Sequence, residues 1–237
     1  MTKSSSKKII IWDFDGVIVD SIPYKYGPIW KDVFSDEVEK EESVISFLNT
    51  EKGKLVNRYG LIAHSLGITG SDDQIKNDIN VRKYAEKYRK CSVDGVIKIG
   101  MFAGAKEVLQ SLSDQGHTMY IVSGGGNDED LKQITDGLSI SHFFNGIFGF
   151  GDIKMPLVTF GKFENFKRIA EIEGTFDSEK YLVIGDGESD YILSKEIGCD
   201  FIGVHSKWNM WNSNNVMKSF TVSDIEEILE RVNKLEK

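Results

Sequence analysis

The sequence predicts an α/β protein: a doubly wound, mostly parallel sheet with a helical domain inserted into it. Five short apolar segments, rich in β-branched and aromatic residues, alternate with stretches whose apolar residues recur at helical spacing. A helical stretch of about 75 residues interrupts this alternation after the first segment. Strands that alternate with helices form a parallel sheet, because each crossover returns the chain to the same end of it.

The first strand is predicted at Ile9–Trp12, a run of three isoleucines and a tryptophan. It delivers two carboxylates, Asp13 and Asp15, just before Gly16. Ligands of open parallel sheets bind outside the carboxyl ends of the strands, so both aspartates are candidate site residues. Taken alone, the same residues would also suit a solvated acidic turn.

The inserted domain is assigned to residues 21–99, and residues 1–20 and 100–237 form the sheet domain. A helix start is indicated at Ser21, shortly before Pro23. The clearest later helix begins at Ser71, where Gln74 completes a capping box that satisfies two amides of the first turn. The whole insertion is therefore predicted to be helical.

The remaining elements follow in alternation. Strands are predicted at 118–122, 144–150, 181–184 and 201–204, and helices at 105–112, 128–136, 162–173, 189–197 and from Ser223 onward. Glycines at 116, 137, 174 and 198 are placed to end four of the helices.

Three of the strands end in polar loops, and a parallel sheet brings those ends to one edge. The loops contain Asp13 with Asp15, Ser123 followed by three glycines, and Asp186 with Asp190. Four carboxylates in one crevice repel each other, and a hard divalent cation with oxygen ligands relieves this. None of these loops contains a histidine, which favours Mg²⁺ over zinc.

Composition narrows the class of protein further. A chain of 237 residues with a net charge of −8 is not built to coat nucleic acid or an anionic membrane, so neither is expected as a partner. Cys91 and Cys199 are far apart and show no metal-binding spacing, which favours a reducing, cytoplasmic setting. The apolar run near the N-terminus is too short for a signal peptide or a membrane span.

Together these segments resemble the haloacid dehalogenase-like hydrolase superfamily over about residues 9–204. Asp13-Phe14-Asp15-Gly16-Val17 is similar to its first motif, Ser123 to its second, Lys162 to its third, and Gly185-Asp186 with Asp190 to its fourth. The resemblance implies a Rossmann-like core with an inserted cap. The cap position is similar to that of the phosphoglycolate phosphatase and β-phosphoglucomutase branch, whereas Ser123-Gly124-Gly125 is more similar to phosphoserine phosphatases.

The resemblance implies a magnesium-dependent phosphatase that acts on a small phosphorylated metabolite. In it Asp13 would be the nucleophile, forming an aspartyl-phosphate, and Asp15 the general acid and base. Lys162 would neutralise charge, while Ser123, Gly124 and Gly125 would bind the phosphate. The implied Mg²⁺ ligands are Asp13, Asp15 through its backbone carbonyl, Asp186 and Asp190.

Several alternatives stay open at this point. A phosphomutase would carry the same motifs, and a non-catalytic phosphate-binding relative would keep the same fold. Lys154 competes with Lys162 as the third-motif lysine. In the cap, Tyr24, Lys25 and Arg58 are the candidates for substrate specificity, but no pattern among them names a substrate, and the oligomeric state is not indicated.

Overall fold

The computed structural model describes residues 7–35, 37–54, 56–150, 162–205, 221–222 and 224–235. The chain divides into two compact units. The sheet unit comprises Met1–Asp20, Gly100–Gly149 and Gly161–Lys237, and the helical unit comprises Ser21–Ile99 and Phe150–Phe160. No helix among the described residues is long and apolar enough to cross a membrane.

The sheet unit contains a six-stranded sheet in the order β3-β2-β1-β4-β5-β6, and every pair of neighbours is parallel. This is the strand order of the doubly wound dinucleotide-binding folds, so the predicted Rossmann-like α/β fold is confirmed. The strands are β1 (Ile9–Trp12), β2 (Thr118–Val122), β3 (Gly146–Phe148), β4 (Tyr181–Gly185), β5 (Asp200–Val204) and β6 (Thr221–Val222).

Strand β1 lies at the centre of the sheet, and all four of its residues are buried. Trp12 is in register with Ile121 of β2 and Ile184 of β4. The pairing continues one residue further, where the Asp13 amide donates to the Ile184 carbonyl at 2.8 Å. The apolar run of β1 is therefore what places Asp13 at the carboxyl edge, between two neighbouring strands.

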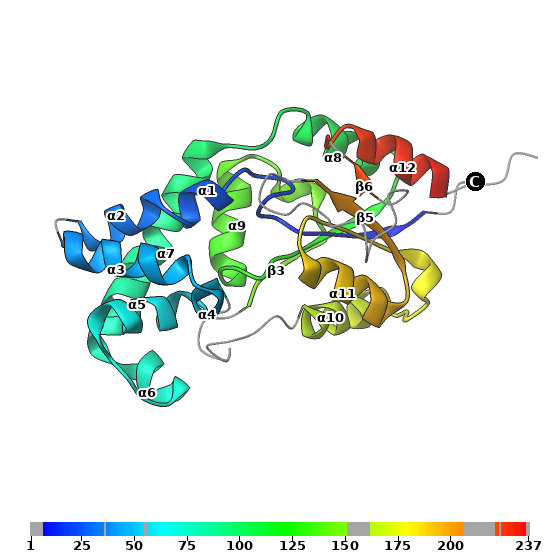
Figure 1. Ribbon diagram of the computed structural model, residues 1–237. Coiled ribbons are helices and arrows are strands. Elements are labelled where there is room, and N and C mark those ends of the chain that lie inside the picture. Colours follow the sequence, from blue (N-terminus) through cyan, green and yellow to red (C-terminus); the bar gives the residue numbers. More distant parts are fainter. Residues whose placement is uncertain are drawn as a thin grey trace, which may run out of the picture. The chain divides into compact units, whose positions relative to one another are not determined.

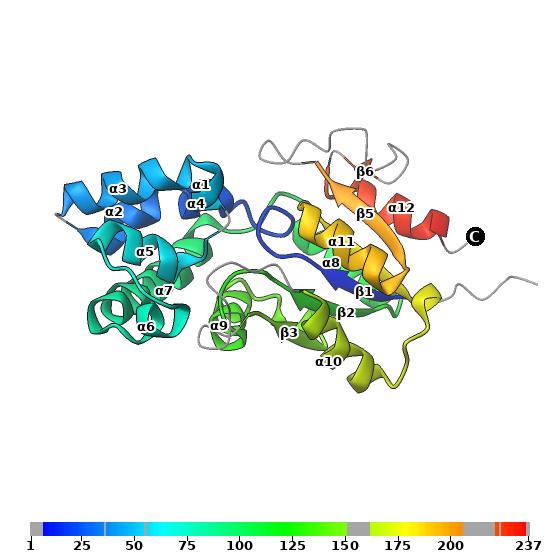
Figure 2. The ribbon, with the colours of Figure 1, turned by 60° about the horizontal axis from the view of Figure 1, so that its bottom comes forward.

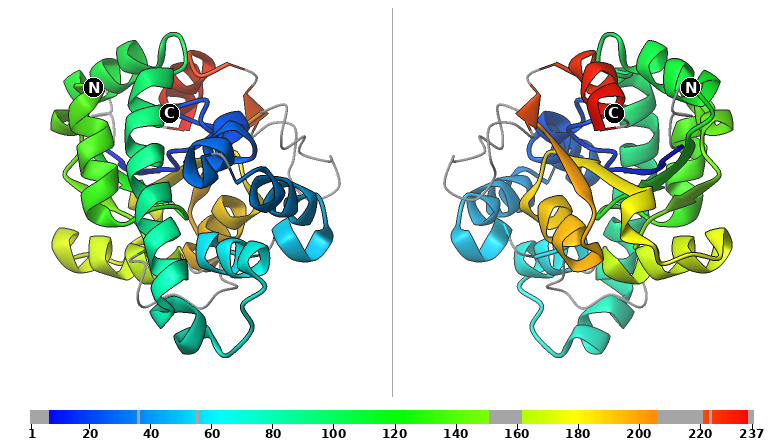
Figure 3. Two further views of the ribbon diagram at one scale, coloured as in Figure 1. Left: turned by 90° about the vertical axis from the view of Figure 1, so that its left-hand side faces the viewer. Right: turned by 90° about the vertical axis from the view of Figure 1, so that its right-hand side faces the viewer.

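Helices cover both faces of the sheet. Figures 1 and 2 show α8 and α12 on one face and α10 and α11 on the other, and Figure 3 gives the same layers from the sides. Phe166 and Ile169 of α10 and Leu193 of α11 pack in one buried cluster with residues of β1, β2 and β4. The helices of this unit are α8 (Ala105–Asp114), α9 (Asp128–Gly137), α10 (Phe163–Glu173), α11 (Glu188–Ile197) and α12 (Glu227–Leu235), with short 3₁₀ turns η1 (Ser141–Phe143) and η2 (Ser178–Lys180).

The helix ends differ in part from the predictions. Helices α10 and α11 end as expected, at Gly174 and Gly198 in left-handed conformation. Helix α9 ends at Gly137, but the left-handed residue that follows it is Ser139. The predicted start of the last helix was wrong, because α12 begins at Glu227, and Ser223 lies outside the described residues.

The sheet also differs from the prediction in two places. Strand β3 covers only Gly146–Phe148 of the predicted 144–150, as its glycines weaken the strand pattern. The sixth strand, Thr221–Val222, was not predicted, because two residues are too few to show alternation.

The described residues between Ser21 and Ile99 fold mainly into α-helices, as predicted. The core of the helical unit includes Trp30 and Phe34 of α2, Ile62 of α5 and Tyr84 of α7, and the predicted capping box at Ser71 is present. The helices are α1 (Ile22–Lys25), α2 (Pro28–Phe34), α3 (Val38–Leu48), α4 (Glu51–Lys54), α5 (Arg58–Leu66), α6 (Asp72–Asn77) and α7 (Ile79–Ile99).

Candidate active site

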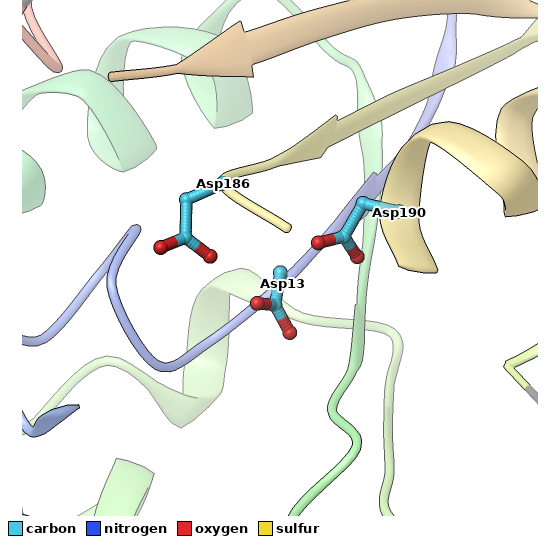
Figure 4. Close-up of side chains that lie close together, drawn as sticks. All are labelled: Asp13, Asp186 and Asp190. Atoms are coloured by element: carbon cyan, nitrogen blue, oxygen red, sulfur yellow. The ribbon is translucent and has the colours of Figure 1, made fainter. Parts of the chain in front are cut away.

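Three aspartates gather at the carboxyl edge of the sheet. Asp13 follows β1, Asp186 follows β4, and Asp190 lies in the first turn of α11. One carboxylate oxygen from each lies within 4.8 Å of those of the other two, and Figure 4 shows the three carboxylates turned toward a shared space. The residues are only 8%, 6% and 1% exposed. We call this group the carboxylate cluster.

Asp190 is held in the carboxylate cluster by the start of α11. Its Oδ2 accepts a hydrogen bond from the Gly187 amide at 3.1 Å, at the end of the helix where free amides and the helix dipole favour negative charge. Its side chain also packs directly on Gly185, the last residue of β4. An alanine Cβ at position 185 would lie 2.2 Å from the Asp190 Cγ, so the glycine leaves the space that the carboxylate fills.

Lys162 brings one positive charge into the carboxylate cluster. It precedes α10, is 5% exposed, and its Nζ lies 2.6 Å from an oxygen of Asp13 and 2.6 Å from an oxygen of Asp190. The contact with Asp190 could not be predicted from the sequence, because it depends on how the starts of α10 and α11 meet in the fold. The competing Lys154 lies outside the described residues.

Burial and neighbouring charges shift the pKa values of Asp13 and Lys162 at the carboxylate cluster. Burial, followed by the charge of Asp190, raises the pKa of Asp13 well above its usual range, although Lys162 opposes the shift. Burial alone would lower the pKa of Lys162, but Asp13 and Asp190 together outweigh it and raise that pKa. Among the described residues, the Lys162 ammonium group thus pairs with two of the three carboxylates. Because all the donors are oxygens, the residues suit a hard divalent cation such as Mg²⁺.

Asp15 lies two residues beyond Asp13 and is half-buried. The turn that follows it closes at Gly16, whose φ is 82° and whose amide donates to the Val19 carbonyl at 2.8 Å. Among the described residues, the Asp15 side chain is not a member of the carboxylate cluster.

The loop after β2 lies next to Lys162. Ser123 is 1% exposed, its amide donates to the Phe148 carbonyl at 2.9 Å, and its Oγ accepts from the Gly125 amide at 3.2 Å. A Cβ on Gly124 would lie 3.8 Å from the Lys162 Cε, so the backbone of this loop passes along the lysine stem. The structure thus brings Ser123, Gly124, Lys162 and Asp13 into one neighbourhood.

The three predicted specificity residues lie in the helical unit. The Tyr24 hydroxyl is 3.1 Å from Asp32 Oδ2 and 3.2 Å from the Cys91 carbonyl, and burial raises its pKa. The Arg58 guanidinium lies 5.8 Å from the ring centre of Tyr59, within reach of a cation–π interaction. Lys25 is the last residue of α1. A role of Tyr24, Lys25 and Arg58 in substrate choice remains a proposal.

The contact between Gly185 and Asp190 generates a prediction about stability. Gly185→Ala should lower the free energy of unfolding of the sheet unit by about 1–3 kcal/mol, because the new methyl group overpacks the Asp190 side chain. Gly124→Ala is the matched control and should change it by less than about 0.5 kcal/mol, since its Cβ meets only an ordinary contact. Urea unfolding of both variants measures the difference, and equal losses would contradict the packing described.

Comparisons with known proteins place the chain in a family. A sequence model of the haloacid dehalogenase-like hydrolase family matches residues 10–204. The phosphoglycolate phosphatase of Pseudomonas syringae pv. tomato is 26% identical over 209 residues, which cover 85% of this chain and 71% of that protein. The phosphoserine phosphatase of Methanocaldococcus jannaschii is 24% identical over 203 residues, covering 81% of this chain and 83% of that protein.

Solved structures show the same fold. A predicted phosphatase from Clostridium acetobutylicum superposes with a TM-score of 0.71 and 19% identity, covering 97% of this chain and 100% of that one. At this level of identity the likeness concerns the fold alone. The match to the family model covers more than half of the chain and all four motifs, which confirms the predicted hydrolase class. The chain therefore belongs to the haloacid dehalogenase-like hydrolase family.

Proposed function

We propose that the protein is a magnesium-dependent phosphatase that cleaves a small phosphate monoester through an aspartyl-phosphate on Asp13. The observation that carries the proposal is the buried Asp13 carboxylate, bound by Lys162 at 2.6 Å beside two further aspartates. The two curated relatives described above support it, because both are named as phosphatases.

In the first step, an Asp13 oxygen attacks phosphorus as the bond from phosphorus to the leaving oxygen breaks. Asp15 supplies the proton that the leaving oxygen needs. In the second step, water attacks the aspartyl-phosphate and gives its proton to Asp15, which releases phosphate and restores Asp13. Lys162 holds one oxygen of Asp13 and offsets the charge that gathers there in both steps.

We propose that Asp13, Asp186 and Asp190 hold Mg²⁺, together with the backbone carbonyl of Asp15. The cluster of three buried carboxylates supports this, because it offers three oxygen ligands of the kind that Mg²⁺ prefers. When bound, Mg²⁺ would act as a Lewis acid on the phosphoryl oxygens. It would also reduce the charge repulsion between these oxygens and the attacking carboxylate.

We propose that Ser123 and the amides of Gly124 and Gly125 bind the phosphate of the substrate. Small residues let the backbone approach an anion closely, and successive amides form a concave binding site. The place of Gly124 along the Lys162 stem supports this assignment. In this structure the Gly125 amide is bonded to the Ser123 Oγ at 3.2 Å, so phosphate binding would compete with that bond.

The same proposal includes a class of partner and a cellular location. The partner is a small phosphorylated molecule rather than nucleic acid or membrane. We propose a cytoplasmic location, since both cysteines are free in the structure. Recovery of the protein with a disulfide between Cys91 and Cys199 would contradict a reducing compartment.

We propose that the helical unit selects the substrate through Tyr24, Lys25 and Arg58, and that the substrate carries a carboxylate beside its phosphate. Phosphoglycolate and phosphoserine, which the relatives are named for, both have this form. Arg58→Ala should then raise KM for such acids about ten- to a hundredfold, as expected for a lost charged hydrogen bond. An aryl phosphate without a carboxylate is the control, and an equal rise in KM for both substrates would remove Arg58 from recognition.

Substitutions of the two aspartates after β1 are predicted to impair turnover in different ways. Asp13→Asn should abolish turnover of an aryl phosphate with Mg²⁺, because the nucleophilic oxygen is lost. Asp15→Asn should reduce kcat about a hundred- to ten-thousandfold, with a burst of released aryl alcohol, because the good leaving group needs no acid but the attacking water still needs a base. Rapid-mixing kinetics on both variants, with an EDTA control, measure this.

Normal turnover by Asp13→Asn would contradict the proposed nucleophile. Undiminished activity in EDTA would contradict the metal. Phosphoryl transfer to an added sugar phosphate in preference to water would identify the protein as a phosphomutase, and a wild-type protein that binds phosphate without turnover would be a non-catalytic relative.

A further inference from the structure

Four residues at the edge of the sheet form a closed ring of hydrogen bonds. Asp128, in the first turn of α9, accepts from the Gly149 amide at 2.8 Å and from Arg168 Nη2 at 2.7 Å. Asn165, in the first turn of α10, donates to the Gly149 carbonyl at 3.1 Å and accepts from Arg168 Nη1 at 2.9 Å. Both polar groups of Gly149 are therefore held, and Arg168 ties together the two side chains that hold them.

This ring joins the loop after β2 to the start of α10, where Lys162 lies. On one side, Gly149 packs against the end of the Ser123 loop, since a Cβ on it would lie 2.7 Å from the Gly126 carbonyl oxygen. On the other side, the Asn165 amide donates to the Lys162 carbonyl at 3.1 Å, within the same turn of α10. Helices α9 and α10 lie on either side of β3 in Figures 1 and 2. The ring thus connects the proposed phosphate loop to the turn that carries Lys162.

The geometry of Arg168 is specific. Its guanidinium lies 4.2 Å from the ring centre of Phe148, the residue whose carbonyl receives the Ser123 amide. Two nitrogens of the planar guanidinium reach two different acceptors, a fork that lysine lacks. The side chains of Arg168 and Asp128 are 46% and 45% exposed, and ion pairs that exposed contribute little to stability. A contribution to stability therefore does not explain why Arg168 and Asp128 are paired.

We propose that Asp128, Asn165 and Arg168 are positioning residues that hold Lys162 and the Ser123 loop at the spacing needed for phosphoryl transfer. The proposal rests on the phosphatase function above, and it concerns residues outside the four motifs. Because Arg168 bonds both Asp128 and Asn165, removing its guanidinium frees the two side chains that clamp Gly149. The Ser123 loop and the start of α10 can then shift relative to each other.

The test compares Arg168→Met with Lys167→Met. Lys167 is the matched control, because it lies on the same helix, pairs with Glu164 at 2.7 Å and sits 5.4 Å from the ring centre of Phe163. Arg168→Met should lower kcat about ten- to a hundredfold, as small displacements of catalytic groups do. Its melting temperature should fall by less than about 4 °C. Lys167→Met should change neither kcat nor the melting temperature.

Two further measurements separate positioning from simple loss of structure. Asp128→Asn keeps an acceptor for the Gly149 amide but loses the charged partner of Arg168, so it should reproduce the kcat loss, and the double variant should add little to it. Hydrogen exchange should rise in peptides covering 123–131 and 162–170 in Arg168→Met, and this readout requires no turnover.

Wild-type kcat and wild-type exchange in Arg168→Met would overturn the proposal, as would an equal kcat loss in Lys167→Met. Failure of the proposed function is distinguished separately, since it would appear as an inactive wild-type protein or an active Asp13→Asn. In that case the exchange result alone decides whether the ring holds the two loops.

Discussion

Three carboxylates and one ammonium group share a buried space at the carboxyl edge of the sheet. The need to compensate these buried charges determines which groups can lie around them. Burial makes each charge costly unless a partner meets it. Lys162 meets two of the three carboxylates, Asp13 and Asp190, and the amide of Gly187 meets Asp190 from another side. Oxygen atoms of three carboxylates in one buried space suit a divalent cation, and that cation would in turn attract the phosphoryl group of a substrate.

The fold provides the positions that this charge compensation requires. Asp13 continues the register of the central strand β1, and Asp186 follows the neighbouring strand β4, so the sheet itself brings them together. Lys162 enters from the start of α10, a helix whose Phe166 and Ile169 pack on the sheet. The ring around Gly149 adds a second support, because it bonds the first turn of α10 to the first turn of α9. The strands and the hydrogen-bonded ring around Gly149 together preorganise the site.

Much of this could be predicted from the sequence because the signals are local. The β-branched run before Asp13 and the capping box at Ser71 are short patterns with one structural solution, and both are present in the structure. The contact of Lys162 with Asp190 was not predictable, since it joins residues 28 positions apart whose meeting depends on helix packing. Asp128 and Arg168, 40 positions apart, carried no motif for the same reason. The branch of the family stayed open in the sequence, and the relatives named above likewise include both a phosphoglycolate and a phosphoserine phosphatase.

The most direct test of the charge balance is to look for the cation itself. Crystals grown with saturating Mn²⁺, an anomalous scatterer that replaces Mg²⁺, would locate it in the sheet unit. The account predicts one strong anomalous peak about 2 Å from carboxylate oxygens of Asp13 and Asp186. It also predicts that the peak weakens greatly in Asp186→Asn. Crystals of the wild-type protein with no peak at the carboxylate cluster, and with Lys162 as its sole positive partner, would contradict the account.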